Sequence, residues 1–343
     1  MRNKTKVINI GNVKIGRGNP IAIQSMTNAK NIDDIINQIN LLSDSGCEII
    51  RCAVADFEMA QSLKIIKRNI KIPLVADIHF DYRLAIEAIK NGADKIRINP
   101  GNIGSNDRVK LILDTAKQYQ IPIRIGVNAG SLEKSILKKY NGVTMQGLAQ
   151  SALNFIDMFN AYDFDNIVVS VKSSSVPLSI GAYKILSENT DYPLHVGITE
   201  AGINTVKSSV GLGAILSIGI GDTIRVSLTD NPLNEVECAK EILSALELRK
   251  FGIEFISCPT CARTQIDLIK IASQVKERCK NIQKNIKVAV MGCAVNGPGE
   301  AKDAHIGIAG GKNAGFIFKD GVIIKKVREQ DIVDELINQI NLL

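Results

Sequence analysis

Eight short β-rich segments follow one another along the chain, and a helical pattern separates each from the next. The gap after the third segment is typical: Leu84, Ala85 and Ala88 form an apolar stripe, which Asp81 can cap and Gly92 can end. Eight strand-then-helix units within about 250 residues predict a (β/α)8 TIM barrel. The segments are residues 21–27, 48–54, 74–80, 95–101, 123–130, 166–174, 194–202 and 223–229.

A doubly wound open sheet would use the same units. No Gly-x-Gly-x-x-Gly turn follows the first segment, which favours the barrel. Composition agrees with a packed α/β protein, since 45% of residues are hydrophobic and 22% are charged. Aromatic residues make up only 4%, so Ile, Val, Leu and Ala must build the core.

The rhythm changes near residue 251. Strand patterns at 253–257, 287–291, 305–309, 316–318 and 322–327 are mixed with helical patterns at 264–278 and 329–343. Asp320-Gly321 is a hairpin turn signal. A length of 343 residues also suits two domains. We therefore expect a barrel over 1–250 and a smaller α+β domain over 251–343.

Polar residues gather where the predicted barrel strands end. In most barrel enzymes the chemistry lies at this carboxyl edge. Since residues i and i+2 project from the same side of a strand, five cations should meet at one mouth. The cations are Arg51, Arg97, Arg124, Lys172 and Arg225.

Burying five like charges is costly unless an anion joins them, so a phosphate or diphosphate ligand is expected. The competing interpretation is that these residues lie in solvated loops or pair with acidic neighbours. Asp77 and His79 are candidates to orient substrate or move protons. Glu200 is the better candidate for a general acid or base. Asn128 and Ser227 complete the polar set at the strand ends.

Cys258 and Cys261 form a Cys-x-x-Cys pair, and Cys293 follows in a Gly-Pro-rich loop. Three thiolates thus come within reach of one metal centre, and Glu300 or His305 could add a fourth ligand. Zinc or a redox dithiol are the alternatives. Three cysteines with a carboxylate close a structural zinc site poorly, which favours an iron–sulfur cluster.

The chain has a net charge of +7, so a nucleic-acid-binding protein with a structural zinc site is another alternative. The few aromatic residues argue against stacking on single strands, and we expect no nucleic-acid partner. The charged start lacks the apolar core of a signal peptide, and the most apolar stretch, 210–221, is too short to span a bilayer. We expect a cytoplasmic protein with no membrane partner.

Seven segments, in order, resemble the 4-hydroxy-3-methylbut-2-enyl diphosphate synthases of the non-mevalonate isoprenoid pathway. The resemblance covers nearly the whole chain and fits the bacterial two-domain type. The segments are VADIHF (75–80), RINPGN (97–102), RIGVNAG (124–130), VSVKSS (169–174), GITEAG (197–202), SCPTC (257–261) and MGCAVNGPGE (291–300).

The resemblance implies reductive ring opening and dehydration of 2-C-methyl-D-erythritol 2,4-cyclodiphosphate by two electrons. It implies a sulfite/nitrite-reductase-like second domain, flavodoxin or ferredoxin as electron donor, and a homodimer. It also implies a 4Fe–4S cluster held by Cys258, Cys261, Cys293 and Glu300.

On this interpretation the barrel cations and Ser227 hold the diphosphate. Asp77, His79 and Asn128 orient the carbon skeleton, and Glu200 handles protons. The main alternative is a pterin-type barrel transferase with a structural metal module, which would also need a cationic mouth. Such an enzyme would stay active without iron.

Overall fold

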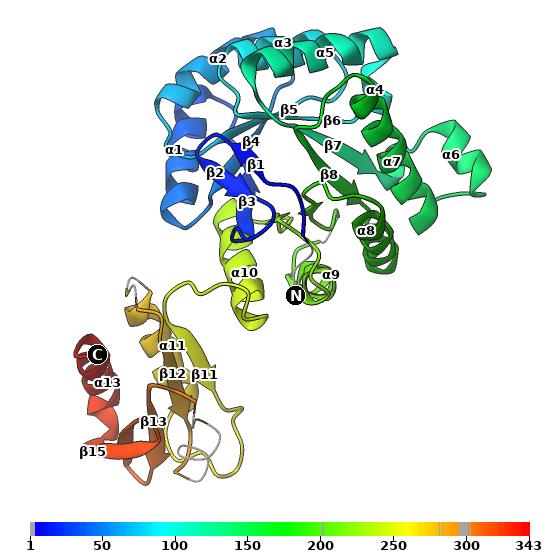
Figure 1. Cartoon of the computed structure of the whole chain (residues 1–343). Coiled ribbons are helices and arrows are strands. Elements are labelled where there is room, and N and C mark those ends of the chain that lie inside the picture. The colour runs from blue at the N-terminus through cyan, green and yellow to red at the C-terminus, as the bar shows by residue number, and fades with distance from the viewer. Residues whose placement is uncertain (1–3, 201, 281, 283, 295–300, 302) are drawn as a thin grey trace. The chain divides into compact units, whose positions relative to one another are not determined.

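The computed structural model describes residues 4–343 except 201, 281, 283, 295–300 and 302. Its internal contacts divide the chain into two compact units, Met1–Arg249 and Lys250–Leu343. Each unit has its own sheet and its own core (Figure 1). Within the described residues, no helix combines the length and apolar character needed to cross a membrane.

The first unit is an eight-stranded parallel barrel, as the repeat predicts. The strands pair in the order β8-β7-β6-β5-β4-β3-β10-β9, and a parallel bridge between Val169 and Leu194 joins the two ends of this row. The strands are β3 (Ala22–Met26), β4 (Ile49–Ala53), β5 (Leu74–Asp77), β6 (Lys95–Ile98), β7 (Ile123–Asn128), β8 (Ile167–Lys172), β9 (His195–Val196) and β10 (Thr223–Ile224).

Helices surround the strands (Figure 1). Several begin at side-chain caps, as at Asp81, whose carboxylate accepts from the backbone N–H of Arg83. The helices are α1 (Ile32–Asp44), α2 (Phe57–Arg68), α3 (Tyr82–Lys90), α4 (Pro100–Ile103), α5 (Asn106–Tyr119), α6 (Lys134–Lys139), α7 (Met145–Ala161), α8 (Val176–Asn189), α9 (Val206–Ser217) and α10 (Pro232–Ala245).

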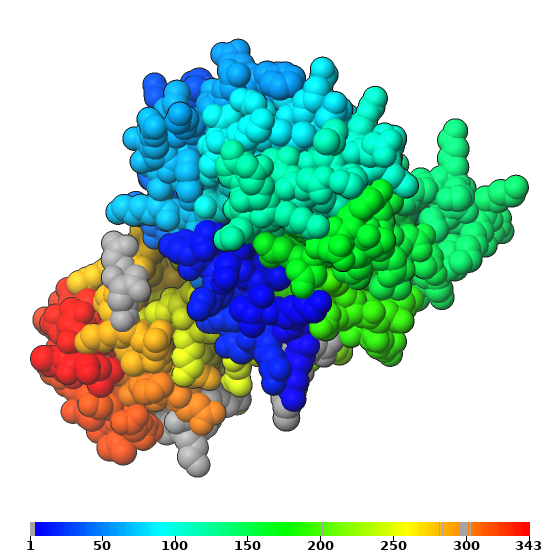
Figure 2. All heavy atoms as spheres, turned by 45° about the horizontal axis from the view of Figure 1, so that its top comes forward, coloured from blue at the N-terminus to red at the C-terminus, as the bar shows by residue number. Residues whose placement is uncertain are grey.

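All eight predicted barrel strands are present, but they are shorter than the sequence segments. Most of the excess residues follow the strands at the carboxyl edge, and residues 100–101 and 129–130 there belong to short helical segments. The long gap before β8 contains the additional short helix α6, which projects from the barrel wall (Figures 1 and 2).

An N-terminal hairpin of β1 (Ile8–Ile10) and β2 (Val13–Ile15) was not expected from the sequence. Ile8, Ile10 and Ile15 pack in one cluster with residues at the amino ends of barrel strands, including Ile49 and Val168. The hairpin therefore closes the end of the barrel opposite the mouth. The two residues between its strands, 11 and 12, are Gly-Asn, which is a two-residue hairpin turn signal.

The second unit is a five-stranded mixed sheet with order β11-β12-β13-β14-β15. The first three strands are parallel and the last two antiparallel. Helices α11 and α13 pack on one face in a cluster that includes Val275, Ile308 and Leu336. The elements are β11 (Glu254–Ser257), α11 (Leu268–Cys279), β12 (Lys287–Met291), β13 (Ile306–Gly311), β14 (Ala314–Lys319), β15 (Val322–Arg328) and α13 (Ile332–Asn341).

Two details of this unit show where local signals decide. Asp320 and Gly321 both have positive φ, at 47° and 79°, as the predicted hairpin turn requires. The first helix begins four residues later than predicted, because Asp267 caps it by accepting from the N–H of Lys270.

Candidate active site

The five predicted cations come from different strands of the barrel and lie at or beneath its carboxyl edge. Arg51, Arg97 and Lys172 are 6% exposed, and Arg124 is fully buried. Arg97 and Arg124 are register partners on β6 and β7, so two guanidinium groups enter the barrel side by side. The structure therefore brings together residues that lie up to 174 positions apart in the sequence, between Arg51 and Arg225.

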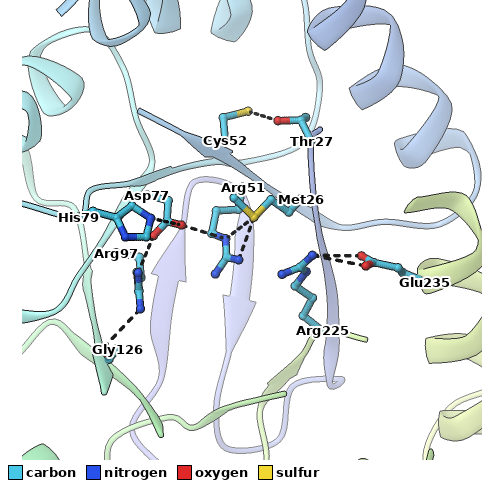
Figure 3. Close-up of polar contacts among 10 residues, drawn as sticks. All are labelled: Met26, Thr27, Arg51, Cys52, Asp77, His79, Arg97, Gly126, Arg225 and Glu235. Atoms are coloured by element: carbon cyan, nitrogen blue, oxygen red, sulfur yellow. Dashed lines mark hydrogen bonds and ion pairs between the residues drawn. The ribbon is translucent and has the colours of Figure 1, made fainter. Parts of the chain in front are cut away.

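Asp77, at the end of β5, is the acidic centre of this cluster (Figure 3). Its carboxylate lies 3.1 Å from Arg97 Nη1, 3.7 Å from Arg51 Nε and 3.4 Å from His79 Nε2. Burial acts to raise the pKa of Asp77, but the hydrogen bond with His79 and the nearby arginine charges outweigh it and hold the pKa far below its usual range. Asp77 is thus a permanent anion, which suits orienting cations better than donating protons.

Two further contacts position Arg51 and Arg225, which we call the outer arginines (Figure 3). Arg51 Nη2 lies 2.9 Å from the sulfur of Met26, and burial lowers the pKa of Arg51 to about 10, so it stays charged at neutral pH. Arg225 Nη2 lies 3.4 Å from Glu235 Oε1 on α10. Each guanidinium has five N–H donors, so both arginines keep donors that these contacts do not occupy.

Gly126 on β7 provides the space for Arg97. A Cβ added at Gly126 would collide with the guanidinium of Arg97, which also donates to the Gly126 carbonyl at 3.4 Å. Glycine at this position permits close approach of the Arg97 side chain, and its backbone freedom is not what matters here.

Arg124 is the strongest sign of an anion site. None of its three side-chain nitrogens has a hydrogen-bond partner among the described residues, although the side chain is fully buried. Burial and the charges of Arg51 and Arg97 lower the pKa of Arg124, so the cluster is electrostatically strained. An anion within reach would satisfy these donors and relieve that repulsion.

The remaining predicted residues lie around the mouth. His79 is half exposed, and Asn128 and Ser227 are partly buried. Asn128 pairs in register with Lys172, which places these two side chains on neighbouring strands. Glu200 is exposed, and its φ of 52° is uncommon for a residue with a side chain, a feature that clusters at functional sites.

The sequence reasoning missed Met26 and Glu235, which hold the outer arginines, and three buried residues deeper in the barrel: Gln24, Lys95 and His195. The three deeper residues lie below the carboxyl ends of the strands, the edge at which the chemistry of barrel enzymes is expected. Extending the i, i+2 alternation one step back from Arg97 would have found Lys95.

Two of the three candidate cluster cysteines follow neighbouring parallel strands of the second unit. Cys258 comes directly after β11, and Cys293 comes two residues after β12. The N–H of Gly292 donates to the sulfur of Cys258 at 3.2 Å, which ties the two segments together. Cys261 is exposed, and a hydrogen bond from the backbone of Arg263 lowers its pKa.

This arrangement suits a metal cluster in its donor chemistry, because a backbone N–H that donates to sulfur stabilises the thiolate form that metals bind. Within the described part of the chain, no three His, Cys, Asp or Glu side chains are already grouped to hold a metal ion. Glu300 lies outside the described residues. The other four cysteines are buried free thiols, as expected for core residues: Cys47, Cys52, Cys238 and Cys279.

Fold and site together define a TIM-barrel enzyme with buried arginine and lysine side chains in its interior, joined to a cysteine-bearing α+β domain. Two family descriptions match the chain, the GcpE TIM-barrel domain over residues 5–240 and the GcpE protein C-terminal domain over residues 254–342. The chain belongs to the GcpE family.

Curated relatives support this assignment over the full length. A protein of Ruminiclostridium cellulolyticum is 55% identical, with 99% of this chain and 98% of the relative covered. A protein of Caldicellulosiruptor saccharolyticus is 59% identical, with 98% of each chain covered. Both are named 4-hydroxy-3-methylbut-2-en-1-yl diphosphate synthase (flavodoxin).

Solved structures share the barrel fold at low identity. Dihydropteroate synthase of Yersinia pestis, with a pterine-sulfa conjugate, superposes with a TM-score of 0.53 at 12% identity, covering 71% of this chain and all of that one. The enzyme of Coxiella burnetii, with pteroic acid, gives 0.51 at 12% identity, with 73% and 100% covered. These likenesses concern the fold alone.

Proposed function

We propose that this chain converts 2-C-methyl-D-erythritol 2,4-cyclodiphosphate to (E)-4-hydroxy-3-methylbut-2-enyl diphosphate, a step in non-mevalonate isoprenoid precursor synthesis. The relatives that match it end to end carry this enzyme's name. The structural observation that carries the proposal is the unsatisfied, buried guanidinium of Arg124 among other cations, since a diphosphate supplies the missing acceptors.

In the proposed site the cations hold the diphosphate and fix its position. Arg51 and Arg97 share the permanent anion Asp77, which keeps their remaining N–H groups directed at the ligand. Ser227 adds a hydroxyl donor. The residues that bind phosphate oxygens in the proposal are Arg51, Arg97, Arg124, Lys172, Arg225 and Ser227.

Asp77, His79 and Asn128 are proposed to orient the carbon skeleton and its hydroxyl groups. Asp77 acts by charge and hydrogen bonding, because its depressed pKa leaves it without a proton to donate. Glu200 is proposed as the group that moves a proton at the departing hydroxyl. Its exposure at the mouth leaves it accessible to a substrate that enters there.

A 4Fe–4S cluster, when bound, would supply the two electrons one at a time and act as a Lewis acid. Cys258, Cys261 and Cys293 are proposed to hold it with Glu300. We further propose flavodoxin as the donor, because the relatives' names specify it. A homodimer remains part of the proposal, as does a cytoplasmic location, which seven free cysteines favour.

The test is to measure iron, acid-labile sulfide and turnover after anaerobic purification and reconstitution. We expect about four iron and four sulfide per chain. We also expect conversion of the cyclodiphosphate with dithionite or reduced flavodoxin. Zinc without sulfide, or no metal, would contradict the redox mechanism.

The pterin-type transferase is the second candidate, because the barrel shares its fold with dihydropteroate synthases. A transferase would not lose activity when Cys258, Cys261 or Cys293 is replaced. The iron and turnover measurements described above therefore distinguish the two candidates, because only the synthase needs iron for activity.

A further inference from the structure

A second polar layer lies beneath the cations of the mouth. We call it the deep layer and define it as Gln24, Lys95 and His195, each at most 1% exposed. Lys95 comes two residues before Arg97 on β6, so its side chain enters the barrel on the same side, about 7 Å further from the mouth. None of the assigned roles above uses these residues.

Polar atoms of the deep layer lack hydrogen-bond partners. Lys95 Nζ, His195 Nε2 and both amide atoms of Gln24 have no hydrogen-bond partner within the described part of the chain. His195 Nδ1 lies 2.8 Å from Thr223 Oγ1, so only its other ring nitrogen is unpaired. A fully buried ammonium without a carboxylate beside it is costly, and a fold retains such a group where a charge elsewhere compensates it.

Basic side chains outnumber carboxylates around Lys95. Six cations occupy the barrel interior: Arg51, Lys95, Arg97, Arg124, Lys172 and Arg225. Among the described residues, two carboxylates pair with them, Asp77 with Arg51 and Arg97, and Glu235 with Arg225. Burial and the charges of Arg124 and Arg51 lower the pKa of Lys95, so its proton is held most firmly when an anion is nearby.

The proposed reaction changes the charge of the ligand. In the cyclic substrate each phosphorus carries one ester bond and one anhydride bond, so each phosphate has one ionised group and the substrate carries about two negative charges. Two electrons enter, the carbon–oxygen bond at C2 breaks, one proton is consumed and one water leaves. The freed oxygen becomes part of a terminal phosphate, and the product carries about three negative charges near neutral pH.

We propose that Lys95 stabilises the charge that appears on the terminal phosphate as the ring opens. It is a positioning residue, because it acts on the ligand through the field it adds beneath Arg97 and Arg124. The buried interior screens that field weakly, and the bound diphosphate favours the charged form of Lys95 before the bond breaks. Lys95 thus favours the opened diphosphate over the cyclic substrate, which is the differential binding that accelerates a reaction. This inference rests on the proposed function.

The test is Lys95→Met, which keeps the length of the side chain and removes its charge. Dissociation constants for the cyclic substrate and for the opened product are measured by calorimetry on the reconstituted holoenzyme without reductant. We expect the affinity for the product to fall about tenfold more than the affinity for the substrate, as one extra unit charge at about 10 Å would give. With reductant present, kcat should fall while KM changes little.

Three variants serve as controls. Lys172→Met removes a cation from the mouth itself and should weaken substrate and product binding together. Lys64→Met removes an exposed charge from α2 and should change neither. Lys95→Gln, which keeps a hydrogen-bond donor without charge, repeats the test with a polar side chain, and melting temperature and iron content are compared for all variants.

The ratio of the two affinities separates the outcomes. If Lys95→Met and Lys95→Gln leave that ratio at the wild-type value, Lys95 only fills the barrel and the inference is wrong. If the wild-type holoenzyme neither binds nor converts the cyclodiphosphate, the proposed function itself fails and the inference falls with it.

Discussion

Asp77 shows how one residue organises a site made of like charges. Three basic side chains meet its two oxygens, and a fourth, Arg124, contributes through its charge. Removing the single carboxylate from such a cluster leaves the arginines buried and mutually repelling. Leaving a buried charge without its partner costs much more folding free energy than the intact ion pair contributes.

We expect Asp77→Asn to destabilise the barrel by about 3–5 kcal/mol at pH 7. Because the folded pKa of Asp77 is depressed, the stability from its charge is present above its unfolded pKa, about 3.9, and is lost as pH falls towards the folded pKa. The difference in unfolding free energy between wild type and variant should therefore be equal at pH 7.5 and pH 6, and smaller below about pH 4. Denaturant titrations at these pH values measure it. A difference that shrinks already between pH 7.5 and pH 6 would contradict the depressed pKa.

At the scale of elements, the barrel depends on a part that its own repeat does not contain. The hairpin of β1 and β2 buries Ile10 and Ile15 completely at the amino ends of the strands. Without the hairpin, the apolar residues at the amino ends of the strands would face water. Exposing apolar surface costs about 25 cal/mol of folding free energy for each Å². The hairpin stabilises the barrel and lies at the end away from the mouth.

We expect Ile10→Ala to lower the free energy of unfolding by about 2–5 kcal/mol, because it leaves a cavity in this cluster. Val7→Ala, at a position that is 51% exposed, is the matched control and should stay within about 0.5 kcal/mol of wild type. Thermal unfolding of both variants gives the comparison, and KM for substrate should be unchanged in both. Equal melting temperatures for the two variants would show that the hairpin contributes little.

At the scale of the whole molecule, the two units have separate cores, and the proposed function assigns a different task to each. The proposed phosphate ligands lie in Met1–Arg249, and the cysteines of the proposed cluster lie in Lys250–Leu343. Electron delivery and diphosphate binding should therefore be separable by mutation.

We expect Cys261→Ser to lose iron and turnover while binding of the cyclic substrate weakens by less than about tenfold. The physical reason is that the barrel cations supply the charge-assisted hydrogen bonds to phosphate. Iron analysis, turnover with dithionite and calorimetry on the same preparation measure the three quantities. A much larger loss of affinity would mean that the second unit supplies a major part of the binding energy.

Local patterns account for most of the fold. Alternating and 3.6-residue periodicities, caps such as Asp81 and the Asp320-Gly321 turn act over a few residues, so the order of strands and helices could be predicted. The β1–β2 hairpin was missed because its strands have three residues each, too few for periodicity to stand out.

The sequence by itself determined the barrel, the α+β second unit, the residue types at the strand ends and the cysteine spacing. Only the tertiary structure decided which cations share Asp77 and that Gly126 makes room for Arg97. It also decided that Lys95 Nζ and His195 Nε2 are buried with no hydrogen-bond partner among the described residues. The reason is that burial and pairing depend on residues brought together from different strands. Separation along the chain carries no information about the dielectric environment or the distance at which two such charges meet.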